Sequence, residues 1–370
     1  ASGSTVIFNN AEMTSNNRFF STDTLTTDVE TPTLQVTGGT FTTDGQAFGM
    51  DVLYRSPVTF TDATVTAGTG PCIEVCGPAA TFTNCNFTVT GENSNGYGAT
   101  AIATSWSGTA EINGGTYSAP NGYGVYVYNS GGKITIKDGT VSGGDAAVRA
   151  DENVQASSPQ QSTVIVEGGS TKGAWQTSDA ENAPLVVMGG THTADVTAYL
   201  AEGCTLTENE GTYTVQEDHA VQVGEQYYGT LERAFANAGQ GDTVKLLADI
   251  ELTKTQDVTG TDITLDLNGN TISGSIANST SAGTSGIIRV NAGASLTITD
   301  NSEGDKGTIL NSGVLTAYAV RVQAGGTLTL NGGVNLRAEG TGTMNQAAAL
   351  YIYNPLSSTA LPTVTINDAN

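Results

Sequence analysis

Charged and aromatic residues recur at one outward position of a repeated short strand. Copies of this strand read MDV (50–52), IEV (73–75), VYV (125–127), IRV (288–290), VRV (320–322) and LYI (350–352). The outward position holds Asp51, Glu74, Tyr126, Arg149, Arg289, Arg321 and Tyr351. Calcium-binding carboxylates with an arginine base, or two carboxylates about 5 to 10 Å apart, cleave acidic polysaccharides. Tyrosine rings beside polar groups instead bind the apolar faces of sugars.

Catalysis would require a base and carboxylates on neighbouring repeats. Asp51 and Glu74 are single carboxylates on successive repeats, far in register from Arg149. The NTD, DD, GHG and RIK sequences typical of polygalacturonases do not occur in the chain. The sequence therefore assigns no catalytic residue, although it leaves an enzyme as an alternative.

Sugar binding is the second interpretation of the same face. Tyr126 and Tyr128 would face outward and stack on sugar rings, and Arg149 on the next repeat would bind carboxylate or sulfate groups. The candidate ligand-binding residues are Tyr126, Tyr128, Arg149, Glu74, Asp51, Tyr54 and Arg55. The alternative is that these side chains only cover the sheet, because tyrosine has a high strand propensity and stacks across strands.

The acidic turn DNSEGD, residues 300–305, is the candidate metal site. Asp300, Glu303 and Asp305 could hold calcium there, although their spacing is not that of an EF-hand. The alternative is a solvated acidic turn. No other cofactor is indicated. The histidines, His192 and His219, are expected to be packed or solvated rather than catalytic.

A short turn sequence, which we call the turn frame, recurs along the chain and positions these residues. The pair Asp138-Gly139 has counterparts at intervals of roughly 20 to 30 residues, which indicates a solenoid with one coil per repeat. The second residues of the pairs are Gly39, Ala63, Cys85, Gly115, Gly139, Gly169 and Gly190. The frame returns at 266–272, 297–302, 329–335 and 365–370.

Short strands with period-two alternation accompany the turns. One column of residues is expected to face inward: Val36, Phe60, Phe82, Ile112, Ile136, Val166 and Val187. Two aligned strands and glycine-rich bends in each coil predict an all-β fold, a parallel β-helix in which equivalent residues stack about 4.8 Å apart. The content of 47 glycines and only 9 prolines agrees with short strands and turns.

Charge and hydropathy limit the partners of the chain. The formal net charge of −23 at pH 7 disfavours nucleic acid and anionic membrane surfaces. No apolar run of about eighteen residues occurs, so we expect no membrane insertion. The opening ASGSTVIF, without methionine or an apolar signal segment, indicates a mature fragment, and we expect a monomer.

The repeat pattern breaks between residues 193 and 252. An i, i+3, i+4, i+7 apolar stripe is formed by Leu231, Ala234, Phe235 and Ala238. With Thr230 as N-cap and Gly239 at the end, the stripe predicts a helix over 230–238. Such a helix would cover the first coil of a second solenoid, whose core and strand edges are otherwise open. The predicted domains are therefore residues 1–215 and 216–370.

The four cysteines, Cys72, Cys76, Cys85 and Cys204, lack the spacing of a zinc ribbon. Cys85 replaces glycine or alanine in the turn frame and is expected to be a small buried residue. If the protein is extracellular, a bridge between neighbouring coils is permitted, and Cys76 with Cys85 is the first pair to test. Nothing in the cysteine pattern indicates a redox enzyme.

Four segments carry a family resemblance: AYLAEGCTLTENEGTYTV (198–215), TLERAFANAGQGDTVKLLADIELT (230–253), ITLDLNGNTISG (263–274) and SLTITDNSEGDKGTI (295–309). Residues 185–340 resemble the right-handed, pectate-lyase-like β-helix repeat regions of secreted or surface adhesin-like proteins from Gram-positive gut bacteria. The resemblance implies two consecutive right-handed parallel β-helices and an extracellular or cell-wall-associated location. It supplies no catalytic residues, because the shared motifs are caps and corners.

Three functions follow from these observations. The first is a non-catalytic surface protein that binds glycans or a host or cell-surface protein along the solenoid face. The second is a polysaccharide lyase or glycoside hydrolase acting on acidic polysaccharide. The third is an inert stalk that displays another domain. We favour the first function, which is not sharply separated from the third.

Overall fold

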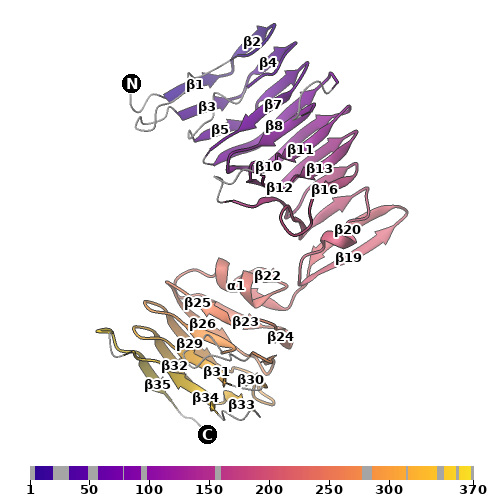
Figure 1. The fold of residues 1–370 in the computed structure, drawn as a ribbon. Coiled ribbons are helices and arrows are strands. Elements are labelled where there is room, and N and C mark those ends of the chain that lie inside the picture. The colour runs from indigo at the N-terminus through magenta and orange to yellow at the C-terminus, as the bar shows by residue number, and fades with distance from the viewer. Residues whose placement is uncertain are drawn as a thin grey trace. The chain divides into compact units, whose positions relative to one another are not determined.

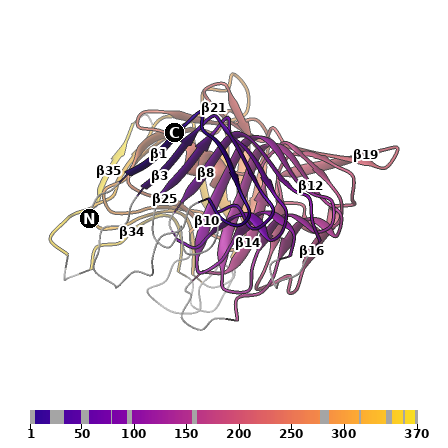
Figure 2. The same cartoon turned by 90° about the horizontal axis from the view of Figure 1, so that it is seen from above.

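The computed structural model describes residues 5–19, 33–48, 57–77, 79–92, 98–154, 160–276, 286–313, 316–339, 346–355 and 358–367. The chain divides into two compact units, Ala1–Gln216 (unit 1) and Glu217–Asn370 (unit 2). Strands dominate the described secondary structure of both units, so the predicted all-β class is confirmed. Figure 1 shows these strands in chain order, and Figure 2 shows the same ribbon from above.

Unit 1 consists of short strands that pair with their equivalents in the next repeat. Its strands are β1 (Thr5–Asn9), β2 (Glu12–Ser15), β3 (Thr33–Thr37), β4 (Thr40–Thr43), β5 (Val58–Thr61), β6 (Thr64–Ala67), β7 (Pro71–Val75), β8 (Ala80–Val89), β9 (Thr100–Thr104), β10 (Gly108–Ala119), β11 (Tyr123–Val127), β12 (Gly132–Gly143), β13 (Ala146–Ala150), β14 (Ser162–Val166), β15 (Ser170–Lys172), β16 (Trp175–Thr177), β17 (Leu185–Val187), β18 (Gly190–His192), β19 (Cys204–Asn209) and β20 (Thr212–Glu217). A short 3-10 helix, η2, spans Thr197–Tyr199.

Two parallel sheets make up most of unit 1. The larger contains β8, β10 and β12, long strands that continue around a bend, and the smaller has the order β16-β13-β11-β9-β7. Among the described strands of unit 1, repeats pair in parallel up to β18, which pairs antiparallel with β20. This stacking of parallel repeats is compatible with the predicted solenoid.

The predicted inward column of unit 1 is confirmed by strand register. Val36 aligns with Phe60, which aligns with Phe82, and the alignment continues through the remaining members, Ile112, Ile136, Val166 and Val187. All seven side chains are buried. Stacking identical positions from successive repeats therefore builds one continuous apolar core.

The turn frame explains why glycine recurs beside this column. Gly115 has a φ of +93°, and a Cβ at this position would lie 2.0 Å from the carbonyl oxygen of Cys85 in the preceding repeat. In that preceding repeat the left-handed residue is Asn84, with φ +52°, so Cys85 itself can carry a side chain. Cys85 is buried in this corner, as expected.

The cysteines are free thiols. Cys72, Cys76, Cys85 and Cys204 are all buried and unbridged, so the suggested bridge between Cys76 and Cys85 is not formed. Cys76 instead lies 3.0 Å, from Sγ to Oγ, from Ser105. Burial raises the pKa of the Cys85 thiol to about 11, which keeps it protonated and unreactive at neutral pH.

Unit 2 has three parallel sheets after a short antiparallel start. Its strands are β21 (Val221–Val223), β22 (Gln226–Tyr228), β23 (Thr243–Leu246), β24 (Ile250–Leu252), β25 (Gln256–Val258), β26 (Asp262–Asp266), β27 (Thr271–Gly274), β28 (Ile288–Val290), β29 (Ser295–Thr299), β30 (Thr308–Asn311), β31 (Thr316–Val322), β32 (Thr327–Leu330), β33 (Asn335–Ala338), β34 (Gln346–Ile352) and β35 (Thr363–Ile366). The sheet orders are β22-β21-β23-β26-β29-β32-β35, β24-β27-β30-β33 and β25-β28-β31-β34.

Helix α1 (Leu231–Asn237) lies at the start of unit 2, where the apolar stripe predicts it. The Thr230 side chain caps the helix by accepting a hydrogen bond from the Arg233 amide over 3.3 Å. Leu231, Ala234 and Phe235 are buried in the core of unit 2, and the helix ends before Gly239. The helix therefore covers apolar side chains of the first repeat.

Among the described residues, no helix combines the length and apolarity needed to cross a membrane.

Candidate functional site

The predicted outward column exists in unit 1. Strand register aligns Glu74 with Ala103, Ala103 with Tyr126, and Tyr126 with Arg149. Tyr126 and Arg149 therefore lie on neighbouring strands of one sheet face, as the sequence predicts. Asp51, Tyr54 and Arg55 lie outside the described residues.

Tyr126 is closed to a ligand by its own neighbours. Its exposed fraction is 2%, and its ring centroid lies 5.1 Å from that of Tyr123 and 5.6 Å from that of Tyr128. The Arg149 guanidinium carbon lies 5.0 Å from the Tyr126 centroid. The Tyr126 hydroxyl donates to Asp151, and burial raises its pKa. The prediction that the Tyr126 ring is open to a sugar is therefore wrong.

The charge of Arg149 is neutralised by Asp151, next to the Tyr126 ring. Arg149 donates through Nε and Nη2 to the two carboxylate oxygens of Asp151, each over 3.1 Å, and it also donates to the Tyr123 hydroxyl. The role assigned to Arg149, binding of a ligand carboxylate, would require this bidentate pair to break. Sequence reasoning missed Asp151, although its i, i+2 spacing from Arg149 places both on one strand face.

Unit 2 contains a similar pairing of arginine and tyrosine, but here the arginine lies on the earlier strand and the tyrosine on the later one. Arg321 aligns with Tyr351 of the following strand and is 2% exposed. Its guanidinium carbon lies 5.6 Å from the Tyr351 centroid and 4.7 Å from that of Tyr353, while Tyr351 stacks on Tyr318 at 4.2 Å. Burial lowers the pKa of Arg321. These arginine and tyrosine clusters cover the outer faces of their sheets.

Glu74 is also enclosed. It is 1% exposed, and its Oε1 accepts a hydrogen bond from the Ser105 hydroxyl over 2.7 Å. The Cys76 thiol lies 3.5 Å from the same oxygen. The expectation of a solvent-facing Glu74 carboxylate is therefore wrong.

The acidic turn of unit 2 is organised around its own backbone. Asp300 Oδ2 accepts from the amides of Gly269 (2.9 Å) and Gly307 (2.7 Å), and Oδ1 accepts from the Ser302 amide (2.9 Å). Burial raises the pKa of Asp300, but the hydrogen bonds from Ser302 and the amides outweigh it and hold the pKa below its ordinary value. The calcium prediction therefore loses its central ligand, because these bonds occupy the Asp300 oxygens.

Glu303 and Asp305 are exposed on the same turn. Within the described ranges, no group of three or more histidine, cysteine or acidic residues has a geometry that could hold a metal ion.

One histidine is packed and the other is exposed. His192 is buried, with Nδ1 2.9 Å from the Thr171 hydroxyl and its ring 5.4 Å from that of Trp175. His219 stacks on Tyr227 with centroids 4.4 Å apart.

An open groove crosses three successive repeats on the larger sheet of unit 1. Its volume is about 310 Å³, and its lining residues come from β8, β10, β12 and the residue before β8: Ala79, Ala80, Thr81, Thr109, Ala110, Glu111, Lys133 and Thr135. Register places Thr81 beside Glu111 and Glu111 beside Thr135, while Thr109 lies beside Lys133. Small side chains between longer charged ones create the depression.

The groove carries hydroxyls and both signs of charge. Glu111 forms an ion pair with Lys137 at 2.8 Å and accepts a hydrogen bond from Asn113 at 2.9 Å. The hydrogen bond from Lys137 is the main cause of the lowered pKa of Glu111. Lys133, which lies beside Thr109, is exposed. The surface can therefore donate and accept hydrogen bonds along the direction in which repeats stack.

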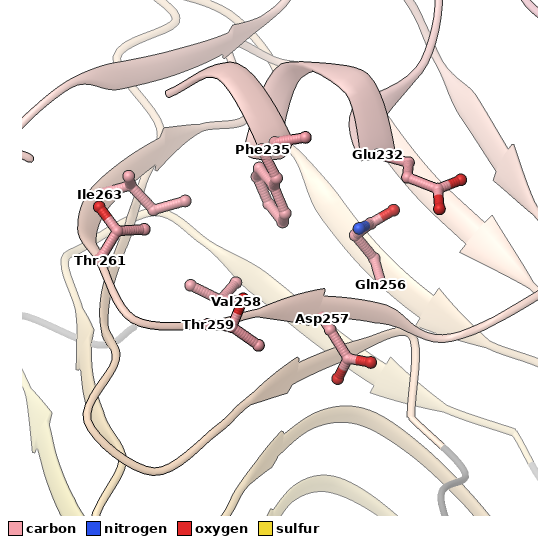
Figure 3. A pocket seen from close by; sticks show the side chains of 9 residues that line it. Glu232, Phe235, Gln256, Asp257, Val258, Thr259, Thr261 and Ile263 are labelled. Atoms are coloured by element: carbon pink, nitrogen blue, oxygen red, sulfur yellow. The ribbon is translucent and has the colours of Figure 1, made fainter. Parts of the chain in front are cut away.

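Unit 2 contains a second concavity beneath helix α1 (Figure 3). Its volume is about 220 Å³, and it is lined by Glu232, Phe235, Ala236, Gln256, Asp257, Val258, Thr259, Thr261 and Ile263. Phe235 points down from the helix toward Val258, and the Gln256 carboxamide points up toward the helix. The pocket is thus lined by apolar and polar side chains together.

Two acidic residues at this pocket are paired. Asp257 accepts from Arg289 through Nε to Oδ1 at 2.5 Å and Nη2 to Oδ2 at 2.6 Å, and from Asn291 at 2.9 Å. Burial raises the pKa of Asp257, but the hydrogen bonds from Arg289 and Asn291 leave it below its ordinary value. Glu232 pairs with Lys254 at 2.7 Å.

Comparison of the chain with models of protein families, with curated proteins and with solved structures found no match.

Proposed function

We propose that this chain is a non-catalytic, extracellular or cell-wall-associated protein, adhesin-like, that binds glycans along the outer face of unit 1. In this proposal both units are right-handed parallel β-helices. The observation that carries the proposal is the open groove over β8, β10 and β12, which presents threonine hydroxyls, a carboxylate and an ammonium group across successive repeats.

The shape of the groove suits an elongated polar ligand. Its volume of about 310 Å³ falls near the lower end of the range for small-ligand pockets, roughly 300 Å³ upward. Strand spacing of about 4.8 Å repeats the contacts along the groove, so weak hydrogen bonds to successive sugar units can add. Lys133 supplies a charge that binds carboxylate or sulfate groups on an otherwise acidic protein.

The state of Glu111 supports binding rather than hydrolysis. A general acid in a glycosidase needs a raised pKa so that it is protonated at working pH. The pKa of Glu111 is lowered, first by the hydrogen bond from Lys137, and its carboxylate is committed to Lys137 and Asn113. This carboxylate is therefore ionised at neutral pH and unsuited to act as a general acid.

The test is a glycan array with the full chain, with and without calcium, repeated for Lys133→Ala. The control is Lys172→Ala, which removes an exposed lysine on β15 of the same sheet. We expect acidic glycans to bind, Lys133→Ala to weaken them about tenfold, and Lys172→Ala to leave them unchanged.

Other results would contradict the proposal. Loss of binding in both lysine variants would indicate nonspecific charge attraction, and no binding to any glycan would favour an inert stalk. Release of reducing or unsaturated sugars from acidic polysaccharide would favour a lyase or hydrolase.

A further inference from the structure

We propose that Trp106 binds one sugar ring beside the groove of unit 1, with its indole face against the apolar CH face of a pyranose unit. The inference rests on the proposed function, to which it adds a specific residue and the part of the glycan that this residue contacts. Trp106 lies in the turn that joins β9 to β10, just before the groove residue Thr109.

The Trp106 side chain is exposed at the surface of unit 1. Its exposed fraction is 42%, whereas the other tryptophan of the chain, Trp175, is 7% exposed. Tyr227 in unit 2 has a similar exposed fraction, 44%, but it stacks on His219. Exposure alone does not indicate a partner, because single apolar side chains are common on protein surfaces. The backbone of the turn supplies the second observation.

The backbone at Trp106 lies in the left-handed region, which favours glycine. The φ angle is +49° at Trp106 and +65° at Ser107, and the Gly108 amide donates to the Ser105 carbonyl over 2.8 Å. This combination is that of a type I′ turn, whose usual central residues are asparagine and glycine. In the next repeat a glycine, Gly131, has the left-handed backbone at this corner. A bulky side chain in this region is strained, and such strain is concentrated at functional sites.

The next repeat holds the turn in place. The Trp106 amide donates to the Ser130 hydroxyl over 2.8 Å, and the Ser107 amide donates to the Gly131 carbonyl over 3.2 Å. Ser130 is itself buried, with an exposed fraction of 2%. These bonds fix the backbone that carries the indole ring before a ligand arrives. Less conformational entropy is therefore lost on binding.

The position of the turn connects Trp106 to the groove. Thr109 follows Trp106 by three residues, so the two Cα atoms lie at most about 10 Å apart. Strand register places Lys133 of the next repeat beside Thr109. A glycan whose acidic group binds Lys133 can therefore place a neighbouring sugar ring on the indole.

The chemistry of the indole ring suits a sugar. A pyranose ring presents CH groups on its face and hydroxyls at its rim, so its face can pack on the indole while the rim keeps its hydrogen bonds. The contact removes apolar surface from water and requires no charge on the sugar. Trp106 should therefore contribute to the binding of acidic and neutral sugar units alike, whereas Lys133 favours acidic ones.

The experiment titrates the full chain with oligosaccharides of polygalacturonate, hyaluronan and heparin by calorimetry. Trp106→Asn removes the ring and suits the left-handed turn, so this variant should fold at least as stably as wild type. We expect it to weaken the bound glycan about tenfold, and Trp106→Phe, which keeps a ring, to weaken it less. Tyr227→Ala removes an exposed ring from unit 2 and is the matched control, which should bind as wild type does.

A measurement on the unaltered protein complements the variants. Acrylamide quenching of tryptophan fluorescence should decrease when the glycan binds, and the change reports on Trp106 because Trp175 is already buried. Unchanged quenching at saturation would overturn the inference and favour an apolar protein surface as the partner of the ring.

The variants separate this inference from the proposed function. If Trp106→Asn binds as tightly as wild type while Lys133→Ala binds more weakly, the inference is wrong and the proposed function stands. Equal losses in Trp106→Asn and Tyr227→Ala would also overturn the inference, because the effect would not be specific to the groove. If wild type binds none of the three glycans, both proposals fail.

Discussion

Gln256 lies in register with Ile288, one repeat further along the same sheet of unit 2. Ile288 aligns with Val320, and Val320 with Leu350, so this inward column is aliphatic at each of the three later strands. The glutamine enters the column at the first repeat, directly beneath helix α1. Packing at this position favours an aliphatic side chain, but the chain has an amide there. Function and stability can conflict at such a position.

The first prediction follows from that conflict. Gln256→Leu completes the aliphatic column and replaces an amide that lines the pocket beneath helix α1. We expect the free energy of unfolding of unit 2 to rise by about 1 kcal/mol, because an apolar side chain then packs on Ile288. Urea melts measure the effect. A drop in stability would mean that the amide has a structural partner.

The second prediction tests the inward column of unit 1. Ile136 is buried between Ile112 and Val166, so Ile136→Asp places a charge in the apolar core and should cost several kcal/mol, about 3 or more. Lys137→Gln is the matched control on the next residue. The Lys137 side chain is 46% exposed, so losing its ion pair with Glu111 should cost less than about 1 kcal/mol. Similar urea midpoints for both variants would contradict the assigned faces.

The third prediction concerns the tyrosine cluster. Tyr126→Ala removes a buried ring that packs against Tyr123, Tyr128 and Arg149, and should lower the free energy of unfolding by about 3 kcal/mol. Tyr126→Phe removes only the hydroxyl that donates to Asp151 and should cost about 1 kcal/mol. Calorimetry gives both values. If instead Tyr126→Phe abolishes glycan binding at unchanged stability, the cluster is a binding site after all.

The sequence predicts inward positions well because alternation along a strand directly assigns each side chain to a face. The column from Val36 to Val187 and the helix around Phe235 depend only on such local patterns. Outward positions are different, because facing away from the core does not mean facing water. Tyr126 is covered by Tyr123 and Tyr128, which are close to it in sequence, and by Arg149 from the next strand, a contact that depends on register between repeats.

The two pockets could not be predicted for a related reason. A groove forms where small side chains lie next to one another on three aligned strands. The sequence alone does not show that Thr81 lies beside Glu111 and Thr109 beside Lys133, because this requires the strand register. Gln256 did have a usable signal. Aligning QDV with IRV and VRV would have shown a polar residue at an inward position.

The last prediction is the pH dependence contributed by Asp300. Its pKa in the folded protein is below the ordinary aspartate value of about 3.9, because hydrogen bonds to the carboxylate outweigh burial. A depressed folded pKa gives stability that is present above the unfolded pKa and is lost as pH falls through the folded pKa. Unit 2 should therefore lose stability below roughly pH 4. Asp300→Asn should be less stable than wild type at pH 7, and the difference should shrink toward pH 2 when urea melts are compared across that range. A difference that stays constant with pH would show that the ionised carboxylate contributes nothing, and that only the shape of the side chain matters to the Gly269 and Gly307 amides.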